Sequence, residues 1–419
     1  MPLCCVFLVD INCFMPIEER IYQELIHEQA ALWFISDDFG AKIMVKAPSS
    51  TIKAIMKGCR VEFLFGKDCL QNPPIFHHAV RIYDDPVHYM TISGTHRYPD
   101  EHASLAAIMG RSYTHIHFHN ELSICVATAT VSFPVADQMK VLNLQGNLQH
   151  LYCGPFDQKA SVSLDRFGYK LKMETPSEEI NSFESIIIEE MIRDWTVMKN
   201  HIIGSNENNK IIFNDAKEGN TFEQEIWAPL NALFGTDAHR NAKIFDKNKF
   251  RELTDVFAHY EDGLFLIESK ALGVVNSSGE RSMGRKVAGV QKQITTGIGQ
   301  VVGAWKKILA NKPVYHANEK DVVFEYSGFK SEALPHCIVL VSELLPFGDW
   351  KHIEMMMFEA MIQNRIYLNV MDLREFMQYI GHARGSKDQL NLMLIERVEC
   401  LVKNQSIHMT LNVIKEKKI

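Results

Sequence analysis

Two neighbouring segments in the C-terminal half constrain the fold most, because together they have the pattern of a β-hairpin. Residues 251–259 and 263–270 are rich in apolar, β-branched and aromatic residues, and the stretch 260–263 between them has the composition of a turn. The second segment is apolar except near its end, where Glu268 and Lys270 stand two positions apart. Side chains at this spacing on a strand point to one face, and charged groups in an apolar strand require an explanation.

The explanation we favour is a metal site. Asp255 lies near the middle of the first segment, so a short antiparallel turn brings it towards Glu268 and Lys270. Two carboxylates supply the hard oxygen ligands that Mg²⁺ prefers, and a lysine can orient an attacking water and offset charge on a phosphate. The alternative is structural: Glu268 and Lys270 form a salt bridge at the edge of a sheet, and Asp255 caps a nearby group.

The elements around the hairpin have a regular order. A helix is predicted at 221–234 before the hairpin, and a long helix at 285–309 follows it. A buried strand at 337–341, a helix at 352–363 and a strand at 367–371 come next. The order of the main elements is therefore α-β-β-α-β.

In this order of elements, Asp255 followed by Glu268-Ser269-Lys270 resembles the PD-(D/E)XK superfamily, the restriction-endonuclease-like nucleases. The resemblance covers roughly residues 218–345. It implies an α/β fold: a C-terminal restriction-endonuclease-like α-β-β-α-β core with a mixed sheet, preceded by an α+β N-terminal domain. It also implies hydrolysis of phosphodiester bonds, with Mg²⁺ as cofactor and Mn²⁺ able to substitute. The proline of the family's name is absent, since Thr254 precedes Asp255.

The same resemblance implies an acidic residue on the first core helix, which would be Glu223 or Glu225. Phe222-Glu223-x-x-Ile226 resembles the spacing in Mrr-like members, so Glu223 is the preferred third metal ligand beside Asp255 and Glu268. The alternative is that both acids lie on a solvated helix face.

The long helix 285–309 has an apolar stripe bordered by polar residues. Lys286, Gln293 and Gln300 repeat every seven residues along this border, and Gly297 also lies on it, which leaves room for a close neighbour. Because several superfamily members have a Gln or Lys from this helix in the active site, Gln293 is the preferred catalytic residue, and Lys286 and Gln300 are the next candidates. In the alternative, these residues only flank a core stripe.

The same region is locally basic although the chain as a whole is acidic. The net charge is −7, yet residues 281–312 contain seven Lys or Arg and no Asp or Glu. Such a segment suits contacts to a phosphate backbone, which carry no sequence information. The residues predicted to bind nucleic acid are Arg281, Arg285, Lys286, Lys292 and Gln300. A solvated helix face is the alternative.

The sequence divides into three parts. Residues 1–175 have an α+β pattern, with two short helices near 18–27 and 101–109 and no motif that assigns a function, and we expect a recognition or regulatory domain. Residues 176–217 are predicted to be a connector, with an amphipathic helix from 177 to about 199. Residues 218–419 form the nuclease-like domain.

The strands predicted in the first part share runs of apolar or alternating residues. They lie at residues 4–9, 31–35, 43–45, 61–65, 79–83, 87–92, 113–118 and 123–131. His115, His117 and His119 alternate along one of them, which allows a distant third interpretation, a small-molecule enzyme that uses these histidines.

Composition predicts the class of protein. Hydrophobic residues make up 46% and charged residues 23%, as in soluble globular proteins, and no apolar run approaches the ~20 residues of a membrane span. Nine cysteines without Cys-x-x-Cys spacing indicate reduced thiols and a cytoplasmic location. The N-terminal apolar stretch lacks a preceding basic residue, so we expect a buried strand there and no signal peptide.

The sequence leaves two main functions open. The first is an endonuclease that acts on DNA, of the kind found among bacterial restriction and anti-phage defence effectors. The second is a catalytically inactive nucleic-acid-binding or scaffold protein that keeps the nuclease-like fold. A homo-oligomer would supply the two sites needed to cut both strands, although no interface pattern is visible in the sequence.

Overall fold

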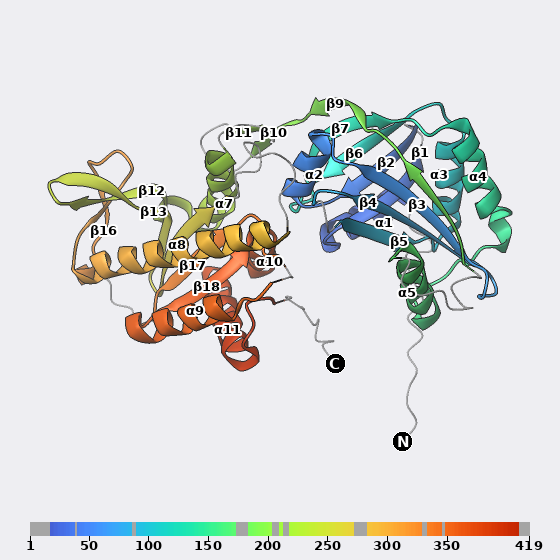
Figure 1. The fold of residues 1–419 in the computed structure, drawn as a ribbon. Helices are drawn as coiled ribbons and strands as arrows, with labels where there is room; N and C mark the ends of the chain where they lie inside the picture. Colours follow the sequence, from blue (N-terminus) through green and yellow to red (C-terminus); the bar gives the residue numbers. More distant parts are fainter. Residues whose placement is uncertain are drawn as a thin grey trace, which may run out of the picture. The chain divides into compact units, whose positions relative to one another are not determined.

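The computed structural model describes residues 17–37, 40–85, 89–172, 183–202, 209–212, 218–271, 283–328, 333–345 and 348–409. The chain forms two compact units, shown as a ribbon in Figure 1. One comprises Met1–Met198, and the other begins at Lys199. Both combine helices with sheets, so the α/β class expected from the sequence is confirmed.

The N-terminal unit contains two sheets that pack on each other. The first has the order β1 (Ala31–Asp37), β2 (Gly40–Lys46), β6 (Thr114–His119), β7 (Cys125–Val131) and β9 (Arg193–Val197). The second has the order β5 (Met90–Thr95), β4 (Ile75–Ile82), β3 (Val61–Asp68) and β8 (Phe183–Glu189). Phe34 of β1 and Phe65 of β3 meet between the sheets, with ring centroids 5.9 Å apart.

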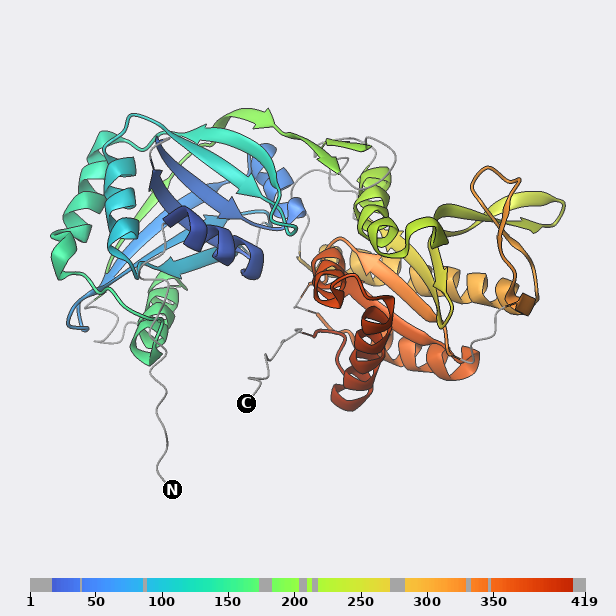
Figure 2. The ribbon, with the colours of Figure 1, turned by 180° about the vertical axis from the view of Figure 1, so that it is seen from behind.

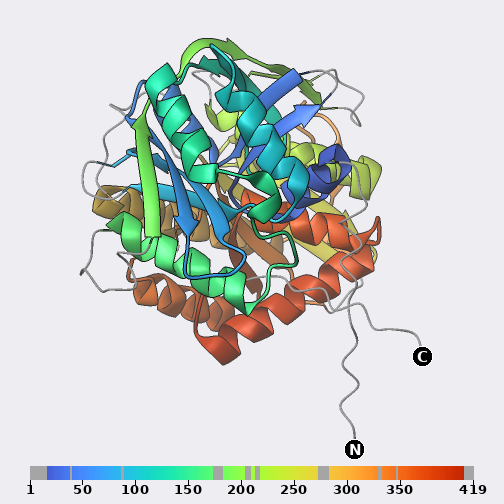
Figure 3. The same cartoon turned by 90° about the vertical axis from the view of Figure 1, so that its right-hand side faces the viewer.

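Helices cover the sheets of this unit. They are α1 (Ile17–His27), α2 (Ser49–Met56), α3 (Pro99–Met109), α4 (Val135–Gln145), α5 (Gln158–Lys172) and the short 3₁₀ turn Leu148–His150. α3 packs on β1 and lies beside α4, as Figure 3 shows, and α5 packs on β3, β4 and β5. α2, α4 and α5 were not expected from the sequence.

The prediction of a helix from residue 177 to about 199 is wrong for those of its residues that the structure describes. Residues 183–189 form β8, which pairs with β3 along its whole length, and residues 193–197 form β9, which pairs with β7. The Ile186-Ile187-Ile188 run suits a strand, and pairing with a buried neighbour outweighs the local helical pattern. The division between the units falls at Met198, so these strands belong to the first unit and not to a helical connector.

The other N-terminal elements follow the expected pattern. Both predicted helices are present as α1 and α3, and six of the predicted strands match β1 to β4, β6 and β7. β5 begins at Met90, three residues after the predicted start, and the predicted strand at residues 4–9 lies outside the described residues.

The C-terminal unit is built on a seven-stranded mixed sheet. Its order is β16 (Val322–Phe324), β15 (Val314–Tyr315), β12 (Ala238–Asp246), β13 (Lys249–Tyr260), β14 (Gly263–Lys270), β17 (His336–Val341) and β18 (Tyr367–Asp372). β14, β17 and β18 are mutually parallel neighbours, and the remaining pairs are antiparallel.

Helices cover both faces of this sheet. α8 (Met283–Leu309) and α9 (Lys351–Asn364) lie on one face, towards the viewer in Figure 1. α7 (Glu218–Phe234), α10 (Leu373–Ala383) and α11 (Lys387–Asn404) lie on the other, as the rear view in Figure 2 shows. The predicted helices and strands of this half are all present, but β12 was missed, so three antiparallel strands and not two follow α7. A small β10–β11 hairpin (Lys199–Ile202 with Asn209–Ile212) also belongs to this unit.

α8 approaches the sheet closely at one point. A Cβ added to Gly297 would lie only 2.6 Å from Cγ1 of Val339 in β17, so the space expected at this glycine is filled by the sheet. Ile294, Ile298 and Val301 of the apolar stripe are buried in the same core. The predicted inward face of α8 is therefore confirmed.

The described helices include none that is both long enough and apolar enough to span a membrane.

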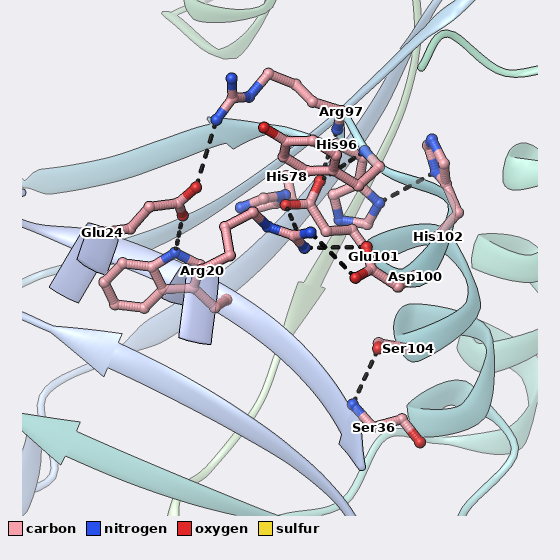
Figure 4. A network of polar contacts seen from close by, with 12 residues as sticks. Arg20, Glu24, Ser36, His78, His96, Arg97, Asp100, Glu101, His102 and Ser104 are labelled. Carbon is pink, nitrogen blue, oxygen red and sulfur yellow. Dashed lines mark hydrogen bonds and ion pairs between the residues drawn. The ribbon is translucent and has the colours of Figure 1, made fainter. Parts of the chain in front are cut away.

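A buried polar network connects α1 with α3 in the N-terminal unit (Figure 4). The guanidinium of Arg20, whose side chain is 2% exposed, donates to both carboxylate oxygens of Asp100 and lies 3.9 Å from the centroid of the Tyr98 ring. Glu24 of α1 accepts a 2.7 Å hydrogen bond from the Trp33 indole. These bonds fix α1 against the sheet and α3.

Four buried histidines lie close to this network. His78, His96 and His102 contact one another, with 3.3 Å between the Nδ1 atoms of His96 and His102, and His77 hydrogen-bonds Thr95 and Ser163. Burial lowers the pKa of all four, to about 3 for His77 and about 4 for His78. The imidazoles are therefore neutral in the folded protein at neutral pH.

We expect acid to destabilise the N-terminal unit. The unfolded chain protonates these histidines near pH 6.5, whereas the folded unit resists protonation, so the free energy of unfolding should fall as the pH drops from about 6.5 to 5. Burial raises the pKa of Glu101 to about 7, so protonation of this carboxyl in acid stabilises the folded unit. This one carboxyl offsets only part of the effect of the four imidazoles. Hydrogen exchange of β4 amides across this range measures the effect, and unchanged protection would contradict it.

Candidate active site

The three residues of the predicted site lie on two central strands, just beyond the point where the regular pairing of β13 with β14 stops. β13 and β14 pair from Tyr260 and Gly263 as far as Val256 and Ile267. Asp255 and Glu268 occupy the next positions and are 7% and 3% exposed. β14 lies between β13 and β17, so Glu268 and Lys270 are in the middle of the sheet and not at its edge.

Side chains bridge the two strands where their regular pairing ends. Thr254 Oγ1 donates a 2.7 Å hydrogen bond to the carbonyl oxygen of Ile267. One carboxylate oxygen of Asp255, Oδ2, accepts two bonds from Ser269, at 2.6 Å from the backbone N–H and 2.7 Å from the hydroxyl. Ser269 therefore fixes the orientation of the Asp255 carboxylate.

Lys270 and Glu268 form a close ion pair, as expected for residues two apart on a strand. Lys270 Nζ lies 2.8 Å from Oε2 of Glu268. Burial is the main cause that raises the pKa of Glu268, the negative charge of Asp255 adds to it, and Lys270 opposes both, so that the pKa is about 7. The electrostatic influence of Asp255 shows that the two carboxylates lie close enough to repel each other.

Glu252 adds a further carboxyl to this group, which the sequence analysis did not identify. The register of β13 against β12 shifts between Thr254 and Glu252, so Leu253 is an extra residue in a β-bulge. Through this bulge Glu252 reaches Asp255 and forms a hydrogen bond with it. Burial and that bond raise the pKa of Glu252. A bulge leaves no signature in the hydrophobic pattern, which is why Glu252 was missed.

Of the two helix acids, Glu223 lies near the carboxyl group of Glu252 and is paired with a cation. Glu223 of α7 forms a 3.2 Å ion pair with Arg240 of β12, and its charge also raises the pKa of Glu252. Glu225 is half-buried on the same helix. Glu223 is therefore within electrostatic range of the Glu252 carboxyl group, but Arg240 already neutralises its charge.

Gln293 brings α8 to the end of β14. Its Nε2 donates a 2.8 Å hydrogen bond to the carbonyl oxygen of Ala271, which directly follows Lys270. Its Oε1 is buried and has no hydrogen-bond partner among the described residues. The polar border of α8 thus faces the strand that carries Glu268 and Lys270.

The residues predicted to bind nucleic acid differ in exposure. Arg285, Lys292 and Gln300 are exposed on α8, and Lys286 is half-buried. Arg281 lies outside the described residues.

The carboxylates suit a cation held by few protein groups. Among the described residues, no group of three or more His, Cys, Asp or Glu is arranged to hold a metal ion, so Asp255, Glu268 and Glu223 do not form a ready-made set of ligands. Asp255 nevertheless has one oxygen that Ser269 does not engage, next to a buried like charge. Mg²⁺ typically binds through one or two carboxylates and keeps several waters, which fits this pair.

The histidines of β6 do not assemble a comparable site. His115 is exposed, His117 is half-buried and His119 is buried, and the described residues place no metal-binding group around them. The interpretation of these histidines as the catalytic centre has no geometric support among the described residues.

Comparison of the chain with models of protein families, with curated proteins and with solved structures finds no match. The resemblance to the PD-(D/E)XK superfamily therefore rests on the residues and the element order alone.

Two substitutions should move the pKa of Glu268 in opposite directions. Asp255→Asn removes a like charge and should lower it below about 7, whereas Lys270→Ala removes the compensating cation and should raise it. An NMR titration of the glutamate side-chain carboxyl carbons measures both shifts. Glu261→Gln, in the exposed turn of the same hairpin, is the matched control and should leave the pKa unchanged. Shifts of the same sign in both variants would rule out this electrostatic arrangement.

Proposed function

We propose that the C-terminal unit is a Mg²⁺-dependent endonuclease that hydrolyses phosphodiester bonds in DNA. The observation that carries the proposal is the buried pair Asp255 and Glu268, with Lys270 bound to Glu268, where β13 and β14 stop pairing and beside the polar border of α8. Buried like charges destabilise a fold unless they are compensated, so their presence points to a function.

Each residue has a role in this proposal. Asp255 and Glu268 hold the cation, with Mn²⁺ able to replace Mg²⁺, and Ser269 keeps the Asp255 carboxylate oriented. The bound cation lowers the pKa of a coordinated water and polarises a phosphate oxygen. Lys270, released in part from Glu268, neutralises charge that develops on the phosphate. Gln293, whose side-chain oxygen accepts no hydrogen bond from the part of the chain that the structure describes, orients the water or the phosphate.

α8 supplies the surface for the phosphate backbone. Its residues 283–309 contain five basic side chains and no acidic one. Arg285 and Lys292 are exposed and lie seven residues apart, hence on nearly the same side of the helix. Lys286 and Gln300 extend this surface along the border that carries Gln293. A chain of net charge −7 needs such a local patch to approach DNA.

The wider role follows from the resemblance. Soluble two-domain nucleases of this kind resemble bacterial restriction and anti-phage defence effectors, which act in the cytoplasm. The N-terminal unit would then recognise a substrate, a partner or a trigger. A homo-oligomer would cut both strands of a duplex, because each strand needs its own site.

A second candidate function is binding to nucleic acid without cutting. Two observations favour it: the Lys270–Glu268 ion pair, and the ion pair that neutralises Glu223. In this case the basic side chains of α8 would act alone. Cleavage assays separate the two functions.

Cleavage should depend on Asp255 and Lys270. Plasmid and single-stranded DNA should be cut in the presence of Mg²⁺ or Mn²⁺, and Asp255→Asn and Lys270→Ala should each lower the rate on the order of 100-fold or more. Glu261→Gln, another carboxyl of the same hairpin, should cut at the wild-type rate. Metal-independent cutting, or full activity in both site variants, would disprove the nuclease proposal; retained DNA binding without any cutting would support the second function.

DNA binding should depend on the exposed cations of α8 and on salt. Replacing Arg285 and Lys292 with alanine should weaken duplex binding at low salt and reduce the slope of log K against log salt by about 0.9 per lost phosphate contact. Binding measured by fluorescence anisotropy between 50 and 200 mM salt, roughly the range over which such contacts are lost, tests this. Lys159→Ala, an exposed lysine of α5, is the control. An equal loss in the control would assign binding to the overall charge.

A further inference from the structure

Two hollows on the N-terminal unit meet at one tyrosine. The larger, about 490 Å³, lies where β7 ends and β9 begins, and the smaller, about 270 Å³, lies beside the start of β2 and β6; Tyr113 lines both. The Tyr113 side chain is 58% exposed, and its ring meets the His115 ring edge-on at 5.8 Å. Their combined size falls within the roughly 300–1,000 Å³ of ligand sites, and the ring offers a flat stacking surface.

The smaller hollow has the chemistry of an anion site. The described residues that line it include Arg111, Ser112 and His115, and none of them is a carboxylate. Arg111 is exposed and forms no ion pair within the described part of the chain. Its loop is fixed, because the carbonyl oxygen of Arg111 accepts a 2.6 Å hydrogen bond from Gln138. An unpaired guanidinium on a fixed loop, with a hydroxyl and an imidazole beside it, suits a phosphate group.

The larger hollow has the opposite chemistry. Two carboxyl side chains, Glu190 and Asp194, line it together with Arg193 and the apolar side chain of Met191. Asp194 is held in place by a 2.7 Å hydrogen bond from Thr130 to its Oδ2, which leaves Oδ1 for another donor. Carboxylates are acceptors, so they suit a ligand that presents N–H groups next to a flat apolar surface.

We propose that these hollows together bind a free purine nucleoside phosphate, with guanine as the preferred base. The base stacks on Tyr113 in the larger hollow, with its N–H edge towards Asp194 and Glu190, and the phosphate lies against Arg111 in the smaller one. Guanine is favoured over adenine because its edge offers two adjacent N–H donor groups to a carboxylate, whereas adenine offers one. This site lies in the unit for which no function was assigned and does not depend on the nuclease proposal.

Binding of GMP to the full chain tests the inference by isothermal titration calorimetry, with AMP, guanosine and inorganic phosphate as comparison probes. GMP should bind more tightly than each of the three. Tyr113→Ala should weaken GMP binding about tenfold, as expected for the loss of base stacking. Tyr169→Ala is the matched control, since Tyr169 of α5 is 56% exposed and lines neither hollow.

Two further variants separate the ends of the site. Arg111→Gln should weaken GMP binding but leave guanosine binding unchanged, because guanosine lacks the phosphate. Asp194→Asn should reduce the preference for GMP over AMP. The inference is overturned if wild-type protein does not bind GMP at millimolar concentration, if phosphate alone binds as tightly as GMP, or if Tyr113→Ala and Arg111→Gln both bind GMP like the wild type.

Discussion

The Glu268 carboxyl group is buried at the end of a central strand, next to the negative charge of Asp255, and the rest of the candidate site depends on how this repulsion is compensated. Lys270 lies 2.8 Å from one oxygen of Glu268, and Ser269 gives two hydrogen bonds to one oxygen of Asp255. These bonds compensate the burial and the repulsion only in part, since burial first and Asp255 second still raise the pKa of Glu268 to about 7. A divalent cation between the carboxylates would supply the missing charge.

The C-terminal fold could be predicted well because its central elements are long and strongly patterned. β14 is apolar as far as Ile267 and α8 has a continuous apolar stripe, and their predicted bounds agree with the structure to within two residues. β12 was missed for a physical reason: between the buried residues Ala238 and Ala242 stand the polar Arg240 and Asn241, and Asn241 has a positive φ of 52°. Such a strand is defined by its neighbour β13, not by its own pattern.

The N-terminal unit was harder to predict because its stability comes from contacts between distant segments. β8 lies about 115 residues from its partner β3, as the pairing of Asp68 with Phe183 shows, and its sequence also fits a helix. The contact of His78 with His96 likewise joins β4 to the residue that follows β5, and no local spacing marks these histidines as a buried group. The strands themselves were found, because alternation along a strand is a local signal. The pairing of one strand with another is not a local signal and could not be predicted in this way.

The candidate site shows the same division between local and distant information. Asp255, Glu268 and Lys270 were found because a single hairpin brings them together, and Gln293 because helical periodicity places it on the border of α8. Glu252 depends on a one-residue bulge against β12, and the role of Ser269 depends on the point where β13 and β14 separate. Both features are irregularities of the sheet. At an irregularity a side chain can leave the alternation between faces on which sequence-based prediction of strands depends. The buried acidic groups at these points are compensated from within the hairpin, because Ser269 binds Asp255 and Lys270 pairs with Glu268.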